Sequence, residues 1–237
     1  MAESGGKIRT VALIPARGNS KRLPRKNMRM LAGQPLLGYS IDAAVNAANV
    51  DAVYVSTEDP EIAAFARLQG AKVIDRPQSL SSDTAQNDAV IRHAIEAMGA
   101  DGDRPEIALL LQPTSPFRTA SDVRSFVDGF LASDAKSGMS ICPIDHHPGK
   151  AVRVVDERIE PFTTDSDMEA RHQDLPSVLR QNGAIYGVRV ADFLASGRFY
   201  MRPCFAFAMA REKSLDIDDA FDFALAEFMF AHRKAPT

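Results

Sequence analysis

Short apolar runs alternate with longer segments of helical periodicity over the first two thirds of the chain. The apolar runs predict strands at residues 9–15, 52–57, 71–74 and 107–111. Apolar positions recur at helical spacing within residues 35–45, 60–70, 84–98 and a segment that follows Ser121. Strands separated by helices of this length form parallel pairs with right-handed connections, so helices cover both faces of the sheet. The pattern therefore predicts an α/β fold with a doubly wound, mostly parallel sheet.

Individual residues predict where these elements begin and end. Asp59 is a predicted N-cap, Gly70 is a predicted C-terminal stop, and Ser121 is the predicted N-cap of the next helix. The run at 107–111 is so uniformly apolar that we expect a central strand buried on both faces. In such sheets ligands bind beyond the carboxyl ends of the strands, so the loops that follow the first and fourth predicted strands are candidate site loops.

The regular alternation ends near residue 145. The stretch 156–182 is polar with irregular hydrophobic spacing, and β-like pieces lie at 151–155 and 184–190. We interpret residues 145–200 as an excursion, a small dimerisation arm, from a single domain that spans residues 1–237. The chain then returns to the domain and closes with a helix at about 219–233.

Composition narrows the class of protein. A chain of 237 residues that is 45% hydrophobic can bury the core of one α/β domain. Its formal net charge of −3 argues against a nucleic-acid-binding protein, because such proteins normally need a basic surface. Cys142 and Cys204 lie far apart, which argues against a zinc site or a disulfide framework and indicates a reducing compartment. Without a membrane-length apolar run or a signal-peptide core, we expect a cytoplasmic protein that does not bind membranes.

The loop after the first predicted strand concentrates positive charge. It contains a glycine and no acidic residue, and its cations are Arg17, Lys21, Arg22, Arg25 and Lys26. Backbone amides and fixed positive charges in such a loop suit a polyphosphate. The spacing matches neither the Walker loop nor the dinucleotide fingerprint, so a solvated basic surface loop stays the alternative.

Asp216 and Asp218 form a second candidate site. Alternate residues of an extended segment point to the same side, and two converging carboxylates suit Mg²⁺, which otherwise takes phosphates and water. The alternative is a helix entry in which Asp218 or Asp219 is the N-cap. Gln112 ends the predicted central strand and suits a hydrogen bond to a polar ligand, or else belongs to an ordinary turn. The guanidinium of Arg180 is well matched to a carboxylate or phosphate.

Taken in order, these motifs resemble those of the N-acylneuraminate cytidylyltransferases, the CMP-sialic acid synthetases. They run from about residue 8 to 231 as IPARGNSKRLPRKN, LLGYSIDAA, VSTEDPEIA, SDTA, LLLQPTSPFRT, CPIDHHPGK, RQNGAIY and SLDIDDAFD. One such motif is a weak signal, whereas their shared order and spacing identify the family. The resemblance implies the Rossmann-like fold of nucleotide-diphospho-sugar transferases. It also implies transfer of CMP from CTP to the anomeric hydroxyl of a sialic acid, with Mg²⁺ as cofactor and pyrophosphate as product.

The resemblance implies a role for each matching residue. Arg17 and Lys26 are expected to contact the CTP phosphates and Asp216 and Asp218 to hold the metal, so these four are the expected catalytic residues. The expected nucleotide-binding residues are Ala16, Arg17, Gly18, Asn19, Ser20, Lys26, Asn27, Ser82, Asp83 and Thr84. The expected substrate-binding residues are Gln112, Lys150, Arg180, Asn182, Tyr186 and Phe199. No histidine stands where a general base is needed, and a metal-activated nucleophile suffices.

Three positions depart from the family pattern, namely Gln86, His172 and Gln181. The first two lie on the expected sugar side, so they bear on which sugar is bound and not on CTP. The same reaction on legionaminic acid, pseudaminic acid or Kdo is therefore kept as an alternative, and a non-catalytic nucleotide-binding homologue is a further one. The expected partners are CTP, a nonulosonic acid and a second copy of the chain, in a homodimer whose subunits help to complete each other's sites.

Overall fold

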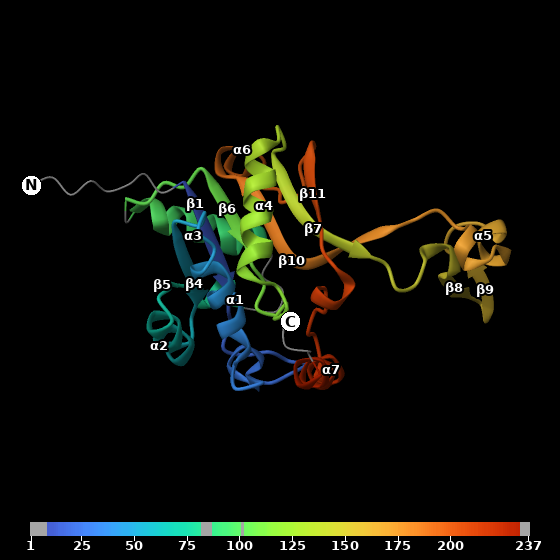
Figure 1. The fold of residues 1–237 in the computed structure, drawn as a ribbon, viewed down its shortest axis with the longest axis horizontal. Coiled ribbons are helices and arrows are strands. Elements are labelled where there is room, and N and C mark those ends of the chain that lie inside the picture. The colour runs from blue at the N-terminus through green and yellow to red at the C-terminus, as the bar shows by residue number, and fades with distance from the viewer. Residues whose placement is uncertain (1–8, 82–86, 101, 233–237) are drawn as a thin grey trace, which may run out of the picture.

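The computed structural model describes residues 9–81, 87–100 and 102–232 (Figure 1). A seven-stranded sheet with the order β11-β7-β10-β6-β1-β4-β5 forms its centre. The strands are β1 (Thr10–Pro15), β4 (Ala52–Thr57), β5 (Lys72–Asp75), β6 (Ile107–Leu110), β7 (Ser137–Pro143), β10 (Leu179–Arg189) and β11 (Cys204–Ala208). Strand β1 pairs in parallel with β4 and β6, and β10 runs antiparallel between β6 and β7. The predicted α/β fold with a mostly parallel sheet is confirmed.

Helices cover both faces of this sheet. The helices that pack on the sheet are α1 (Leu36–Val45), α2 (Pro60–Leu68), α3 (Asn87–Ala100), α4 (Ala120–Ala132) and α6 (Val190–Ser196). Two further helices, α5 (Asp165–Glu169) and α7 (Ala220–Ala231), lie away from it. On one face Ile14 of β1 belongs to the core formed with α1, α2 and α4, in which Phe126 is fully buried. On the other face Leu13 belongs to the core formed with α3 and α6. Successive side chains of β1 thus point into different cores, as expected for a strand in a sheet that helices cover on both faces.

The predicted helix boundaries are confirmed at α2 and wrong at α4. The Asp59 carboxylate accepts hydrogen bonds from two backbone N–H groups of α2, and Gly70, with φ of 85°, follows the end of that helix. The N-cap of α4 is Thr119 and not Ser121, which lies inside the first turn. The Thr119 hydroxyl accepts from the Asp122 N–H at 3.3 Å, and the Asp122 carboxylate accepts from the Thr119 N–H at 2.9 Å. This reciprocal capping box outweighs the isolated serine that suggested the other boundary.

Residues 144–178 project from the body as an arm (Figure 1). The arm contains a two-stranded hairpin of β8 (Val152–Val155) and β9 (Arg158–Pro161) together with α5. Strand β10 begins directly after it and returns into the central sheet. Residues 179–200 therefore belong to the body, and the projecting segment is shorter than the predicted range 145–200. The first residues of β10 lack a clear apolar pattern, so the sequence indicated a strand only from 184.

Helix α7 brings the C-terminal segment to the N-terminal basic loop. Its N-cap is Asp219, one of the two residues that the helix-entry interpretation named. Phe223 of α7 and Leu23 of the basic loop share a small core with Ile217, which is fully buried. This core is the reason that Asp218, far away in sequence, lies beside the loop. Across the described ranges, no helix is both long and apolar enough to cross a bilayer.

Candidate active site

A cavity of about 300 Å³ opens at the carboxyl ends of β1 and β6. Strand β1 is flanked by β4 on one side and β6 on the other, so the connections diverge here, as at the ligand-binding switch point of other doubly wound sheets. The cavity is lined by Pro15, Arg17, Ser20, Lys26, Asn27, Arg76, Leu80, Val90, Gln112, Pro113, Thr114, Asp216 and Asp218. The structure thus brings the basic loop, Gln112 and both aspartates into one cavity.

The basic loop is held in place from behind by acidic residues of the β4–α2 connection. The Gly18 N–H donates to Glu58 Oε1 at 2.8 Å, and a Cβ on Gly18 would lie 2.3 Å from Asp59 Oδ2. A larger residue at position 18 would therefore displace the Asp59 side chain, which caps α2. Burial alone would raise the pKa of Glu58, but hydrogen bonds from Gly18 and Arg76 hold the pKa of that carboxyl below its usual value. Asn27, which is buried, donates to the Arg17 carbonyl at 2.9 Å and closes the loop.

Lys26 joins the basic loop to the aspartate segment. Its ammonium donates to the Ile217 carbonyl at 2.8 Å and lies 3.7 Å from Asp218 Oδ1. Burial lowers the pKa of Lys26, although Asp218 and Asp216 act in the opposite direction. The result is a largely desolvated cation at the wall of the cavity, where a charge interacts more strongly with a ligand than it does in bulk water.

Asp216 and Asp218 both face the cavity, as their alternation in an extended segment predicts. The intervening Ile217 points into the core, and its N–H donates to the Thr114 carbonyl at 2.8 Å. Burial raises the pKa of Asp216, an effect that the Thr114 side chain partly offsets by hydrogen bonding, and Asp218 raises it further. Among the described residues, Asp216 Oδ1 is buried without a hydrogen-bond partner. A buried carboxylate oxygen with an unmet demand for a partner fits a cation ligand.

The two carboxylates match the donor set that Mg²⁺ takes from proteins. No cluster of three or more histidine, cysteine, aspartate or glutamate side chains suited to a metal occurs in the described part of the chain. Mg²⁺ typically uses only one or two carboxylates and completes its octahedron with phosphate oxygens and water. Asp216 and Asp218 therefore fit this ion when a phosphate ligand lies against the basic loop.

Gln112 is placed by a buried arginine that sequence reasoning missed. Arg118 is 3% exposed, and its guanidinium donates to the Gln112 carbonyl at 3.3 Å, to the Ala184 carbonyl at 2.6 Å and to Ser40 Oγ at 2.6 Å. Burial lowers the pKa of Arg118 to about 9. Gly183, with φ of 75°, lets the backbone approach Gln112, because a Cβ there would lie 2.8 Å from Gln112 Oε1.

Arg76 is a second cavity residue that sequence reasoning missed. It follows β5, its side chain is 5% exposed, and it forms an ion pair of 2.9 Å with Glu58 Oε2. Its Nε is buried without a hydrogen-bond partner among the described residues. Its position could have marked Arg76 as a site residue, because it follows the predicted strand 71–74 at the same edge of the sheet as the basic loop.

The other expected nucleotide-binding residues have different placements. Ala16 is buried and its N–H continues the strand pairing to the Ser56 carbonyl at 3.0 Å, whereas Asn19 is exposed. Ser82, Asp83, Thr84 and the divergent Gln86 lie outside the described residues. The structure therefore places Arg17, Ser20, Lys26 and Asn27 of the expected set at the cavity itself.

Two of the expected substrate-binding residues lie near the cavity on β10 and the segment after α6. Burial raises the pKa of Tyr186, and the nearby Asp216 carboxylate raises it further. Phe199 contacts Tyr186 edge to face, with ring centroids 6.5 Å apart. Both rings pack against the core that α3 and α6 form with the sheet, and neither lines the cavity among the described residues.

The remaining expected substrate-binding residues are engaged elsewhere. Arg180 donates to the Ser214 carbonyl at 3.4 Å. Asn182 is buried, and its amide donates to Ser214 Oγ and accepts from Ser140 Oγ, which assigns it to packing of the sheet. Lys150 lies in the arm, where its ammonium donates to backbone carbonyls of Met168 and Ala170. None of these three residues lines the cavity of its own chain among the described residues.

Comparison with known proteins gives consistent matches over nearly the whole chain. The sequence profile of a family described as cytidylyltransferase matches residues 11–198. The N-acylneuraminate cytidylyltransferase of Escherichia coli O18:K1:H7 is 32% identical over 220 residues, which cover 93% of this chain and 52% of that protein. The CMP-N,N'-diacetyllegionaminic acid synthase of Legionella pneumophila is 33% identical over 228 residues, with coverage of 93% and 95%.

The fold is shared with a solved structure of a CMP:2-keto-3-deoxy-manno-octonic acid synthetase complexed with CTP. That structure has a TM-score of 0.70 at 18% identity and covers 94% of this chain and 98% of its own. In length, this chain spans about half of the first curated relatives that it matches. It spans nearly all of the Legionella protein.

Proposed function

The chain belongs to the cytidylyltransferase family, as its motifs predicted, and on this premise we propose that it transfers CMP from CTP to the anomeric hydroxyl of a sialic acid, with release of pyrophosphate. The observation that carries the proposal is the meeting of the basic loop with Asp216 and Asp218 in one cavity at the switch point of the sheet. A triphosphate needs cations from the protein and a metal held by carboxylates, and this cavity offers both.

The residues of the cavity divide the work of an in-line displacement at the α-phosphate. Arg17 and Lys26 bind and orient the phosphates, and Lys26 offsets the charge that develops on the leaving pyrophosphate. Asp216 and Asp218 hold Mg²⁺, which when bound neutralises phosphate charge and polarises the α-phosphoryl group. The anomeric oxygen bonds to the α-phosphorus as the bond to pyrophosphate breaks, and the hydroxyl proton passes to water, since a bound Mg²⁺ would lower the pKa of that hydroxyl. Such a transfer depends mainly on positioning and charge compensation, so the proposal needs no histidine base.

The acceptor sugar lies on the side of Gln112 and Tyr186. Gln112 follows the carboxyl end of β6, and Tyr186 lies opposite that end on the antiparallel neighbour β10; Asp216 is close to both. The same reaction on legionaminic or pseudaminic acid is the second candidate, because the Legionella relative is as similar as the E. coli one. The same reaction on Kdo, and a nucleotide-binding homologue without catalytic activity, rank below these two candidates.

A pyrophosphate-release assay with CTP and a panel of sugars tests the proposal. The panel contains N-acetylneuraminic, legionaminic and pseudaminic acids and Kdo, with a no-sugar control and with ATP in place of CTP. We expect release that requires both CTP and a nonulosonic acid and is fastest with N-acetylneuraminic acid. Faster release with another sugar would select the second candidate, and CTP binding without release from any sugar would identify a non-catalytic homologue.

Arg76 is expected to contribute to CTP binding. Its side chain lines the cavity, and a hydrogen bond from a charged group contributes about 1.5–3 kcal/mol. We expect Arg76→Met to raise the KM for CTP by roughly tenfold or more, since 1.36 kcal/mol is a factor of ten. Arg67→Met is the matched control, because Arg67 is exposed on α2 outside the cavity. An unchanged KM in Arg76→Met would exclude a contact with the nucleotide.

We also propose that the arm mediates a homodimer and brings Lys150 to the site of the partner subunit. Val154 and Ile159 face each other across β8 and β9 and are 71% and 70% exposed. Paired exposed apolar side chains on a projecting hairpin indicate a surface that a partner covers. This arrangement would give a substrate-binding role to Lys150, which lies in the arm and does not line the cavity of its own chain.

Disruption of this hairpin surface is expected to give monomers. For Val154→Asp combined with Ile159→Asp, we expect sedimentation velocity to show a monomer and pyrophosphate release to fall. Leu68→Asp is the control, because Leu68 is 83% exposed on α2 of the body. If the double variant sediments as the wild type does, the hairpin surface does not form the dimer interface.

A further inference from the structure

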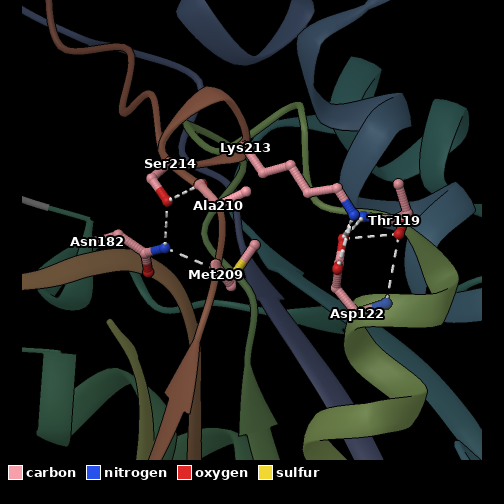
Figure 2. Close-up of polar contacts among 7 residues, drawn as sticks. All are labelled: Thr119, Asp122, Asn182, Met209, Ala210, Lys213 and Ser214. Atoms are coloured by element: carbon pink, nitrogen blue, oxygen red, sulfur yellow. Dashed lines mark hydrogen bonds and ion pairs between the residues drawn. The ribbon is translucent and has the colours of Figure 1, made fainter. Parts of the chain in front are cut away.

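The segment that carries Asp216 and Asp218 is anchored outside the cavity by two neighbouring side chains. Lys213 ends the short 3₁₀ helix η5 (Arg211–Lys213), and Ser214 follows it. Figure 2 shows that the two side chains extend to opposite sides of the chain, Lys213 toward the start of α4 and Ser214 toward β10. Each contact joins this segment to an element of the central fold.

Lys213 is bound to the capping box of α4. Its ammonium lies 2.8 and 2.9 Å from the two carboxylate oxygens of Asp122, and the Thr119 hydroxyl donates to the same carboxylate at 2.6 Å (Figure 2). Burial alone would raise the pKa of Asp122, but the hydrogen bonds from Lys213 and Thr119 outweigh it and lower that pKa. The Asp122 side chain is only 14% exposed, so this pair is better shielded from solvent than a surface salt bridge.

Ser214 forms the second anchor. Its hydroxyl donates to the Ala210 carbonyl at 2.8 Å and accepts from the Asn182 amide at 2.9 Å, and that amide also contacts Met209 Sδ at 3.5 Å (Figure 2). Ser214 is 1% exposed and Asn182 is 2% exposed. A fully buried polar contact of this kind fixes the backbone of the segment, because an unsatisfied partner costs more than the bond contributes.

The Lys213 anchor connects two walls of the cavity. Arg118, directly before Thr119, donates to the carbonyl of Gln112, which lines the same cavity as the aspartates. The same turn at the start of α4 therefore holds Gln112 through Arg118 and the aspartate segment through Asp122 and Lys213. Loss of the Lys213 contact is therefore expected to leave Gln112 in place and to release the aspartate segment on one side.

We propose that Lys213, through its ion pair with Asp122, is a positioning residue that sets the geometry of the Asp216 and Asp218 carboxylates toward a divalent cation. The inference rests on the proposed function only for the metal role of these aspartates. Side chains that hydrogen-bond a metal ligand typically change metal affinity or activity by about 10–100-fold when they are removed, and Lys213 acts one contact further from the carboxylates, so we expect an effect at the lower end of this range. Lys213 touches neither the cavity nor its expected ligands among the described residues, so its effect is indirect.

The test compares Lys213→Met with Lys213→Arg and with Arg211→Met. Arg211 lies in the same short helix and forms an ion pair with Asp145, but its side chain is 74% exposed, so it is a matched control. Mn²⁺ binding is measured by electron paramagnetic resonance in the presence of CTP and the absence of sugar, so that the phosphates complete the ligand set of the metal. The Mg²⁺ concentration for half-maximal pyrophosphate release and the KM for CTP at saturating Mg²⁺ are measured in parallel.

We expect Lys213→Met to weaken Mn²⁺ binding and to raise the half-maximal Mg²⁺ concentration by roughly tenfold, with little change in the KM for CTP at saturating Mg²⁺. Lys213→Arg is expected to restore most of both values, and Arg211→Met to leave them unchanged. A Lys213→Met protein that melts at a lower temperature but binds Mn²⁺ as the wild type does would overturn the proposal. Because Mn²⁺ binding needs no sugar, it decides the role of Lys213 even if no sugar of the panel supports turnover.

Discussion

Asp216→Asn is expected to reduce turnover by about a thousandfold or more while the protein stays folded. The variant keeps the size of the side chain but removes the charge that holds the cation. A metal that polarises a phosphoryl oxygen supplies several kcal/mol, and about 4 kcal/mol corresponds to a factor of roughly a thousand in rate. The readout is the kcat of pyrophosphate release at saturating CTP and Mg²⁺.

The stability of the metal-free Asp216→Asn protein is expected to be unchanged or higher. Burial raises the pKa of Asp216, and the nearby Asp218 carboxylate adds repulsion, so the ionised side chain opposes folding near neutral pH. A neutral amide removes this opposition and can still accept the hydrogen bond from Thr114. Urea unfolding without divalent cations measures the free energy of unfolding of both proteins. Added Mg²⁺ should raise this free energy more in the wild type than in the variant.

Asp219→Ala is the matched control for Asp216→Asn. Asp219 is the N-cap of α7 and accepts from the N–H groups of Phe221 and Asp222, at 2.8 and 3.1 Å. Loss of such a cap typically costs about 1 kcal/mol of stability. We therefore expect the opposite pattern, with reduced stability and a kcat close to that of the wild type. If the Asp216→Asn protein keeps its kcat, Asp216 does not hold the catalytic metal.

The fold and the centre of the site could be predicted because local chemistry determines them. The buried strand at 107–111 and the N-cap Asp59 depend on residues close in sequence, and both agree with the structure. The alternation of Asp216 and Asp218 likewise predicted that both carboxylates face one side. Their meeting with the basic loop could not be derived from spacing. It depends on the packing of α7 against Leu23.

Residues that act through tertiary contacts were the ones that sequence reasoning missed or misplaced. Arg118 and Lys213 lie in segments whose local pattern is ordinary, and their roles appear only when α4, β10 and the segment after β11 are brought together. Asn182 was expected to bind substrate because it belongs to a recognisable motif. In the structure its amide is engaged with Ser140 and Ser214 and does not line the cavity of its own chain among the described residues, so substrate binding by Asn182 stays a prediction.

Lys26→Met is expected to lower kcat by about a hundredfold, with a smaller effect on the KM for CTP. Loss of one preorganised group that stabilises developing charge typically costs about 10²–10³ in kcat. The Lys26 side chain is 13% exposed and is held at 2.8 Å from the Ile217 carbonyl, so its charge is fixed before the substrate binds. A fixed, desolvated cation stabilises the leaving pyrophosphate more than the ground state, and for this reason kcat changes most.

Arg25→Met is the control, because it removes the same charge from the same loop outside the cavity. Arg25 is exposed and is paired with Glu61 of α2. Lys26→Arg tests geometry, since it retains the charge but not the compact ammonium that fits between Ile217 and Asp218. We expect Arg25→Met to keep the wild-type kcat and Lys26→Arg to lie between the wild type and Lys26→Met. If Arg25→Met and Lys26→Met lowered kcat equally, the loop would act through its net charge, and the specific role of Lys26 at the leaving group would be wrong.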